Sequence, residues 1–274
     1  MRNAMFTLDP HQRYAMPAHL GPSYRGEKTS GLYHDCTVMA VSYLTDRDKL
    51  AAYLPEPFEV GEEAVVTVFY ACNKQVDWLA GHGYNMIGVN ASVVYKGKTE
   101  QLTGTYSLVI WENLTDPILV GRESQGIPKV YADIPEHSIN HGDWHCSASH
   151  FGHKIVDLSI NKLVQVSDED IVTEQEKNEG KDHPMAWRYL PAIGGYGAPA
   201  IDEFVTFPSR NIFTEVWIGE GQIDWQKLSW EQNPTQFQIV NALEALPVLS
   251  YLPAMVTKGS ADLTLPERWT RTLG

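Results

Sequence analysis

One lysine lies in an unusual setting within VGRESQGIPKVYADIP, residues 120–135. Lys129 follows Pro128 directly and stands between Ile127 and Val130. A lysine that attacks a carbonyl must be unprotonated, whereas the pKa of an unperturbed lysine is about 10.4. Burial among apolar groups or a nearby cation lowers a lysine pKa, because both disfavour the ammonium. The setting is therefore compatible with a Schiff-base nucleophile or with an ordinary lysine after a turn.

A second stretch, HGDWHCSASHFGH, contains residue types that bind metals. If it forms a strand, His141, Asp143 and His145 share one face, because side chains alternate between the two faces. A His-x-Asp-x-His pattern offers three ligands to zinc or iron. Alternation on a sheet with one wet face gives the same pattern, and no HExxH helix signature is present. A metal-dependent enzyme is therefore an alternative, and the main prediction includes no metal site.

The elements that must position these residues read mostly as strands. β-branched and aromatic residues are concentrated in several runs between turn residues, and turn signals recur about every ten residues. The predicted strands are 64–73, 88–97, 104–113 and 203–221. A turn at residues 96–98 predicts a hairpin. The expected fold class is mainly β (α+β), an antiparallel barrel-like sheet with a few short helices.

Helical patterns are scarce. Residues 45–55 form the clearest candidate, with Thr45 or Asp46 as N-cap, and residues 234–247 form a second. A third, weaker candidate covers 126–132. The acidic, polar stretch 167–183 is expected to be a solvated loop or hairpin tip.

Composition excludes several classes of protein. The chain has 274 residues and a formal net charge of -13, so nucleic acid and anionic membranes are poor partners. Cys36, Cys72 and Cys146 are far apart and form no CxxC pair, which disfavours a disulfide framework or a structural zinc site. No signal peptide or membrane span is expected, and a cytoplasmic protein is predicted. P-loop, GxGxxG and GxSxG signatures are absent from the sequence.

The block PILVGRESQGIPK resembles the signature of the acetoacetate decarboxylase family, in which a Gly-Arg-Glu triplet precedes the Schiff-base lysine of a Pro-Lys pair. LTDRDKLAAYLPEPFEV, RYLPAIGGYGAPAIDEFVTFP and LPVLSYLPAMVTKGSADLTLP resemble further family segments and occur in the family's order. The resemblance spans roughly residues 36–273. It implies that Lys129 forms an imine with an oxo acid and that the protonated imine stabilises the electron pair released when a bond to the adjacent carbon breaks.

The sequence departs from the decarboxylase pattern at four positions. The second lysine that follows the reactive one is replaced by Val130. Two active-site glutamates fall on Met86 and near Val68, and an arginine falls near Cys36. Decarboxylation of acetoacetate itself is therefore doubtful, whereas aldolase, dehydratase or unusual decarboxylase chemistry fits the remaining residues.

Six further residues complete the predicted site. Glu203 is the expected general acid/base. Arg122 either anchors a substrate carboxylate or pairs with Glu123. Gln125 shares a face with Lys129 if the segment between them is helical, and it is then expected to hold a substrate oxygen. Tyr84 is a candidate hydrogen-bond donor, and Met86 is expected beside it in the substrate pocket.

The sequence thus predicts a Schiff-base-forming lyase that acts on a small oxo acid or related carbonyl compound through Lys129. No cofactor is expected, because the imine supplies the electron sink. The expected organisation is an N-terminal extension over 1–30 and one catalytic domain over 31–274. The resemblance also implies a homo-oligomer. The alternative from another class is a non-catalytic small-molecule binding protein on the same barrel.

Overall fold

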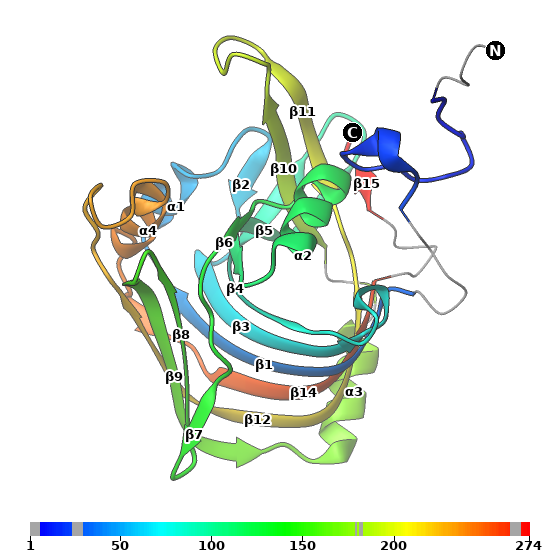
Figure 1. Cartoon of the computed structure of the whole chain (residues 1–274). Helices are drawn as coiled ribbons and strands as arrows, with labels where there is room; N and C mark the ends of the chain where they lie inside the picture. The colour runs from blue at the N-terminus through cyan, green and yellow to red at the C-terminus, as the bar shows by residue number, and fades with distance from the viewer. Residues whose placement is uncertain (1–5, 24–29, 179, 181–182, 264–269) are drawn as a thin grey trace, which may run out of the picture.

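The computed structural model describes residues 6–23, 30–178, 180, 183–263 and 270–274 (Figure 1). It is mainly β, as predicted, and all of its strands belong to one large sheet. The strands are β1 (Leu32–Leu44), β2 (Phe58–Val60), β3 (Val65–Val76), β4 (Tyr84–Lys96), β5 (Gln101–Glu112), β6 (Lys129–Tyr131), β7 (Ser138–Asn140), β8 (Asp143–His150), β9 (His153–Gln165), β10 (Pro184–Pro191), β11 (Pro199–Thr206), β12 (Arg210–Trp225), β13 (Ser250–Tyr251), β14 (Ala254–Asp262) and β15 (Arg271–Thr272).

The sheet runs in the order β15-β11-β10-β5-β4-β3-β1-β14-β12-β9-β8-β7. The long strands β3, β1, β14 and β12 curve together through the lower half of Figure 1. Most neighbours are antiparallel, including the predicted hairpin of β4 and β5. Two pairs are parallel, β5 with β6 and β5 with β10, so the sheet is mixed at this point.

Alternation along the central strands sorts the side chains into two layers. Val66, Val68, Tyr70 and Cys72 of β3 point into the main core, which also holds Trp111. The opposite face of the same strands carries a smaller cluster of buried side chains. Its buried members are Tyr33, Cys36, Val76 and Tyr84, with Trp78, Leu79, Met86 and Leu114 packed against them.

The two clearest helix predictions are confirmed. α1 (Arg47–Ala51) begins after Asp46, whose side chain accepts a hydrogen bond from the Lys49 backbone N–H at 2.9 Å. α4 (Phe237–Glu244) lies within the second predicted range and buries Val240 and Leu243. Short 3-10 turns occur at η1 (Ala18–Leu20) and η2 (Asp77–Leu79).

Three local predictions are wrong. Residues 168–178 form α3 (Asp168–Asn178) and not a loop, because Ile171 is buried and acidic residues in the first turn favour the N-terminal end of the helix dipole. Residues 126–132 contain no helix, since Gly126 has a φ of 73° and ends the preceding helical segment. The predicted strand 203–221 is interrupted at residues 207–209 and belongs to β11 and β12.

β1 begins at Leu32, next to the predicted boundary at residue 31. Residues 1–5 and 24–29 of the predicted N-terminal extension lie outside the described residues. Within the described part of the chain, no helix is long and apolar enough to cross a membrane.

Candidate active site

Lys129 begins β6, which returns beside β5 in parallel register. The chain reaches it through α2 (Thr115–Val120) and one π-helical turn, η3 (Gly121–Gln125), because parallel neighbours need a crossover connection. Gly126 then reverses the chain with a positive φ, and Lys129 pairs with Ile110 of β5. This route turns the Lys129 side chain toward the sheet face that carries the smaller cluster.

The Lys129 side chain is buried beneath the crossover segment. The residue is 8% exposed. Its Nζ donates a hydrogen bond to the Pro117 carbonyl oxygen at 3.2 Å. A Cβ built on Gly121 would lie 2.5 Å from the Lys129 Cδ and 2.9 Å from its Nζ. Glycine at position 121 therefore leaves space for the lysine chain, and a larger residue there would require the Lys129 side chain to shift.

Glu112 is the charged partner of Lys129. The Glu112 side chain is fully buried, and its Oε1 lies 2.8 Å from the Lys129 Nζ. The angles of this ion pair fall outside good hydrogen-bond geometry, so neither Glu112 oxygen has a hydrogen-bond partner among the described residues. Burial raises the pKa of Glu112, and the positive charge of Lys129 partly opposes that rise. The pair is therefore suited to exchange a proton.

Two tyrosines and a tryptophan lie on the same face as this pair. The Tyr33 and Tyr84 hydroxyls are 3.3 Å apart and share a hydrogen bond. The Trp78 Nε1 donates to the Tyr33 hydroxyl at 3.0 Å. Burial raises the pKa of both tyrosines, and the negative charge of Glu112 also contributes to each rise. Both phenols therefore stay protonated at neutral pH and can serve as hydrogen-bond donors.

The strand register shows which face of the sheet carries Met86, Val68 and Cys36, the positions at or near which two glutamates and an arginine of the decarboxylase pattern fall. Met86 pairs with Glu112, so these two side chains share one face of the sheet. Cys36 pairs with Asn73, which pairs with Tyr84, so Cys36 shares that face too. Val68, near which the second family glutamate is expected to fall, lies in the main core on the opposite face. Glu112 thus provides a carboxylate directly across from Met86.

Val130 points away from the Lys129 amine. Side chains alternate along β6, and Val130 packs against the main core. A lysine side chain at position 130 would also point toward the main core, away from the Lys129 amine. The replacement of the second lysine by valine therefore removes no cation from the immediate surroundings of the Lys129 Nζ in this backbone arrangement.

Arg122 and Glu123 do not form the pair considered from the sequence. Arg122 is exposed, and its Nη1 donates to the Lys129 carbonyl oxygen at 2.9 Å. The carbonyl oxygen of Glu123 accepts a hydrogen bond from the Arg188 Nη2 at 2.5 Å. Arg122 therefore holds the backbone of β6 at Lys129.

Glu203 and Gln125 also differ from the expected arrangement. Glu203 Oε2 lies 3.2 Å from the Arg188 Nη1 in a partly exposed ion pair, and no contact among the described residues joins Glu203 to Lys129. Gln125 ends η3 and lies 3.5 Å from the Thr270 hydroxyl. Because the helical segment stops at Gln125 and Lys129 belongs to a strand, the helical face proposed for these two residues does not exist.

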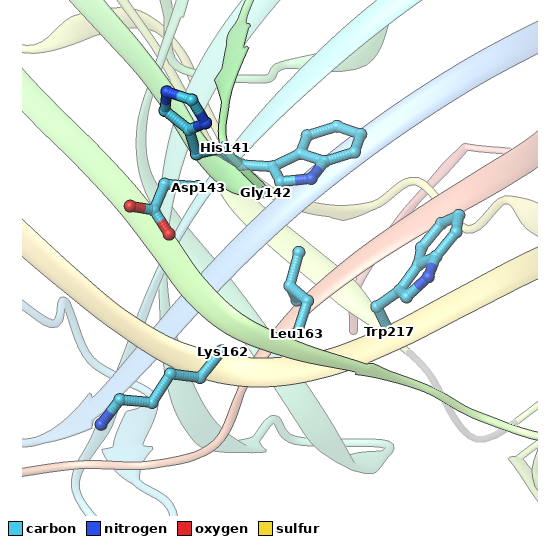
Figure 2. Close-up of a pocket in the computed structure, with 7 residues that line it drawn as sticks. His141, Gly142, Asp143, Lys162, Leu163 and Trp217 are labelled. Carbon is cyan, nitrogen blue, oxygen red and sulfur yellow. The ribbon is translucent and has the colours of Figure 1, made fainter.

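The histidine-rich stretch forms a surface pocket. His141 and Gly142 make the tight turn between β7 and β8 with φ values of 52° and 90°, so His141 is not a strand residue. His145 pairs with Asp157 at 3.1 Å. Figure 2 shows His141, Asp143 and Lys162 around the apolar side chains of Leu163 and Trp217. The cavity measures about 450 Å³. Its turn geometry does not support the three-ligand metal site considered from the sequence.

Glu112 was missed by sequence reasoning. It lies near the end of the run SLVIWEN, where an acidic residue directly before Asn113 resembles the exposed end of a strand. The signal that could have found it is the apolar character of both faces of this run, since Val109, Ile110 and Trp111 are all buried. An acid at the end of a strand buried on both sides needs a charged partner.

Comparison with known proteins places this site in context. The family model described as acetoacetate decarboxylase matches residues 15–263. An acetoacetate decarboxylase of Paraburkholderia xenovorans is 26% identical over 236 residues, covering 83% of this chain and 80% of that protein. A second, from Paraburkholderia phytofirmans, is 31% identical over 195 residues, covering 68% and 69%.

Solved structures share the fold at lower identity. A structure from structural studies of acetoacetate decarboxylase superposes with a TM-score of 0.72 at 17% identity, covering 93% of each chain. The enduracididine biosynthesis enzyme MppR complexed with pyruvate gives a TM-score of 0.68 at 14% identity, covering 96% of this chain and 97% of MppR.

Proposed function

Because the chain belongs to the acetoacetate decarboxylase family, we propose that it is a lyase that forms a Schiff base between Lys129 and a small oxo acid or related carbonyl compound. The observation that carries the proposal is the buried pair of Lys129 and Glu112, whose atoms approach to 2.8 Å. Lys129 is also the lysine that resembles the family's Pro-Lys signature. A buried carboxylate in contact with a buried lysine gives the amine a local proton acceptor.

The reaction begins with proton transfer from the Lys129 ammonium to Glu112. The free amine adds to the substrate carbonyl, and the resulting carbinolamine takes the proton back from Glu112 and loses water. This leaves a protonated imine and an ionised Glu112. A bond to the adjacent carbon then breaks, and its electrons enter the imine to form an enamine. Glu112 is the proton acceptor in this scheme because burial raises its pKa toward the working pH.

The other residues act at greater distance from the amine. In this proposal Tyr84 donates a hydrogen bond to substrate, and Met86 supplies apolar surface beside it. Arg122 positions the reactive strand through its bond to the Lys129 carbonyl. Glu203 acts through Arg188, which holds the turn preceding Lys129 at the Glu123 carbonyl. Gln125 remains a proposed contact for a substrate oxygen.

The substrate class follows from the chemistry of the imine. The protonated imine accepts the electron pair that stays on the adjacent carbon when CO2, an aldehyde or a proton departs from that carbon. A 3-oxo acid carries its carboxylate on this carbon, and a 2-oxo acid such as pyruvate carries protons on it. MppR was solved with pyruvate, a 2-oxo acid, on the same fold. An aldol, dehydration or atypical decarboxylation reaction fits this site, and the absence of a glutamate at Met86 disfavours acetoacetate itself.

Trapping with borohydride tests the proposal. The purified chain is incubated with pyruvate, acetoacetate or another small oxo acid, reduced with borohydride, and digested for mass spectrometry. The expected result is a reduced adduct on Lys129 that disappears in Lys129→Met. Lys154→Met is the matched control, since Lys154 is an exposed lysine in an ion pair. Absence of a Lys129 adduct across the panel would overturn the proposal.

A non-catalytic binding protein is the second candidate, and the closure of the site favours it. The Lys129 amine is covered by Glu112, Pro117 and Gly121. Two cavities of about 450 and 210 Å³ among the described residues are lined by other side chains. Under this alternative, oxo acids bind without forming an adduct, which calorimetry combined with borohydride trapping distinguishes. The predicted homo-oligomer is checked by light scattering on the same sample.

A further inference from the structure

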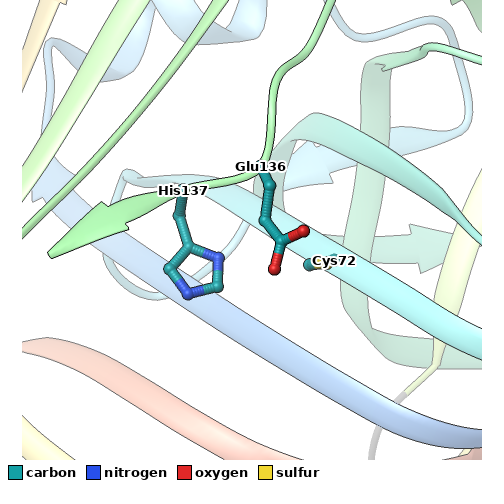
Figure 3. A group of neighbouring side chains, drawn as sticks. All are labelled: Cys72, Glu136 and His137. Carbon is teal, nitrogen blue, oxygen red and sulfur yellow. The ribbon is translucent and has the colours of Figure 1, made fainter.

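Cys72, Glu136 and His137 come together on the side of the sheet away from Lys129 (Figure 3). Cys72 lies in β3 and the other two precede β7, so the group joins distant parts of the chain. One ligand atom from each side chain lies within 4.8 Å of the other two. Within the described ranges, this is the only group of three such residues. Cys72 pairs with Asn85, next to Met86, and therefore faces away from the imine site.

Neighbouring aromatic side chains fix the orientation of this group. The His137 ring stacks on Trp144 with centroids 4.9 Å apart and planes 9° apart. The backbone N–H of His137 donates to the Tyr70 hydroxyl at 3.0 Å, and the same hydroxyl lies 3.4 Å from the His137 Nδ1. Figure 3 shows the Glu136 carboxylate between the imidazole and Cys72. Surrounding contacts therefore already hold the imidazole in place.

We propose that Cys72, Glu136 and His137 form a binding site for a zinc-type divalent cation. Thiolate, imidazole and carboxylate are the three donor groups that proteins use for zinc, and three protein ligands leave the fourth tetrahedral position for water. Bond lengths to zinc are about 2.0–2.3 Å. Donor atoms within 4.8 Å of one another need only small side-chain rotations to reach a common ion.

Each of the three side chains offers one donor atom to a cation. The His137 imidazole offers a ring nitrogen that lies within 4.8 Å of the other two donor atoms. Glu136 offers a carboxylate oxygen. Cys72 is a buried thiol, and binding exchanges its proton for the metal: one Zn–S bond forms and one proton leaves to solvent.

Lys74 is the competitor of the cation. Its Nζ lies 2.5 Å from the Glu136 Oε1. Metal binding must therefore share or displace this ammonium, whose positive charge also repels the ion. Removal of the Lys74 charge is expected to tighten metal binding, which distinguishes a built site from non-specific binding to surface carboxylates.

Cobalt titration of the full chain tests the site. Chelator-treated protein is titrated with Co²⁺ and followed by absorption, because a cobalt–thiolate bond gives a near-ultraviolet charge-transfer band and tetrahedral Co²⁺ gives intense visible bands. One equivalent is expected to bind with both signals, and Zn²⁺ is expected to displace it. Cys72→Ser should abolish the charge-transfer band. Cys146→Ser, which removes another buried cysteine, should retain it.

Two exposed residues make the test independent of folding. Glu136→Gln is expected to weaken Co²⁺ binding by about tenfold or more, and Lys74→Gln to strengthen it. Retention of the thiolate band in Cys72→Ser, its absence from the wild type, or equal affinity in Glu136→Gln and the wild type would each overturn the proposal. The outcome does not depend on Lys129, because the readout is metal binding and not turnover.

Discussion

Replacing Lys129 with methionine distinguishes the contribution of the ion pair to stability from the contribution of side-chain packing. Methionine keeps the length and apolar character of the lysine chain beneath Gly121 and removes the ammonium. Glu112, fully buried, then loses its only charged partner among the described residues. Removal of one member of a buried ion pair typically costs about 3–5 kcal/mol of unfolding free energy, because the remaining charge is uncompensated.

The double-mutant cycle with Glu112→Gln gives the size of the coupling. Glu112→Gln alone is expected to cost about 1–3 kcal/mol, since Lys129 keeps the Pro117 carbonyl oxygen as a partner. Lys129→Met combined with Glu112→Gln is expected to be about as stable as the wild type, because no buried charge remains. The coupling free energy of the pair is the difference between the unfolding free energy lost in the double variant and the sum of the losses in the two single variants. We expect the loss in the double variant to be much smaller than that sum.

The pH dependence follows from the raised pKa of Glu112. Folded protein holds this proton more tightly than the unfolded chain. The stabilising contribution is complete below the unfolded pKa, about 4.3, and is lost as pH rises through the folded pKa. Without Lys129 the folded pKa is higher still. Lys129→Met therefore loses stability relative to the wild type as pH rises, by at most about 1.4 kcal/mol per pH unit.

Urea unfolding followed by tryptophan fluorescence at pH 5 and pH 8 measures these differences. The gap between the wild type and Lys129→Met is expected to be larger at pH 8. Equal gaps at the two pH values, or single-variant costs that simply add in the double variant, would refute the reasoning that Glu112 and Lys129 form a buried, proton-sharing pair.

Two further predictions concern the surroundings of the lysine. Gly121→Ala places a methyl group 2.5 Å from the Lys129 Cδ, so it is expected to cost about 1–3 kcal/mol of unfolding free energy and to slow borohydride trapping. The control is Ser124→Ala, which changes an exposed residue. Unchanged trapping in Gly121→Ala would contradict the close packing of this glycine against Lys129. Glu203→Gln is expected to cost at most about 1 kcal/mol and to change trapping less than Lys129→Met does, because its ion pair is partly exposed; complete loss of trapping would instead place Glu203 at the amine.

Much of the fold could be predicted because its signals are local. β-branched runs between turn residues located β3, β4 and β5, and Asp46 marked the start of α1. The acidic stretch over α3 was misjudged because charge patterning resembles a loop when only Ile171 is buried. The parallel partners of β5 were also missed, since strand direction depends on chain routing and not on composition.

Candidate residues were only partly predictable from the sequence. The sequence identified Lys129 by its Pro-Lys setting and family signature, and it identified the departures at Met86 and Val130. It also suggested Glu203 as the general acid/base. A motif match carries no information about which side chains meet in the fold, so it could not reveal Glu112 as the residue beside Lys129.

The sequence by itself determined the strand-rich fold and the family, and it singled out Lys129 as the candidate nucleophile. Tertiary structure alone decided the partner of the lysine, because Glu112 meets Lys129 only when β6 returns parallel to β5. It also decided the grouping of Cys72 with Glu136 and His137. In both cases the physical reason is the same: residues that are separated in the sequence become neighbours through strand register and chain crossover.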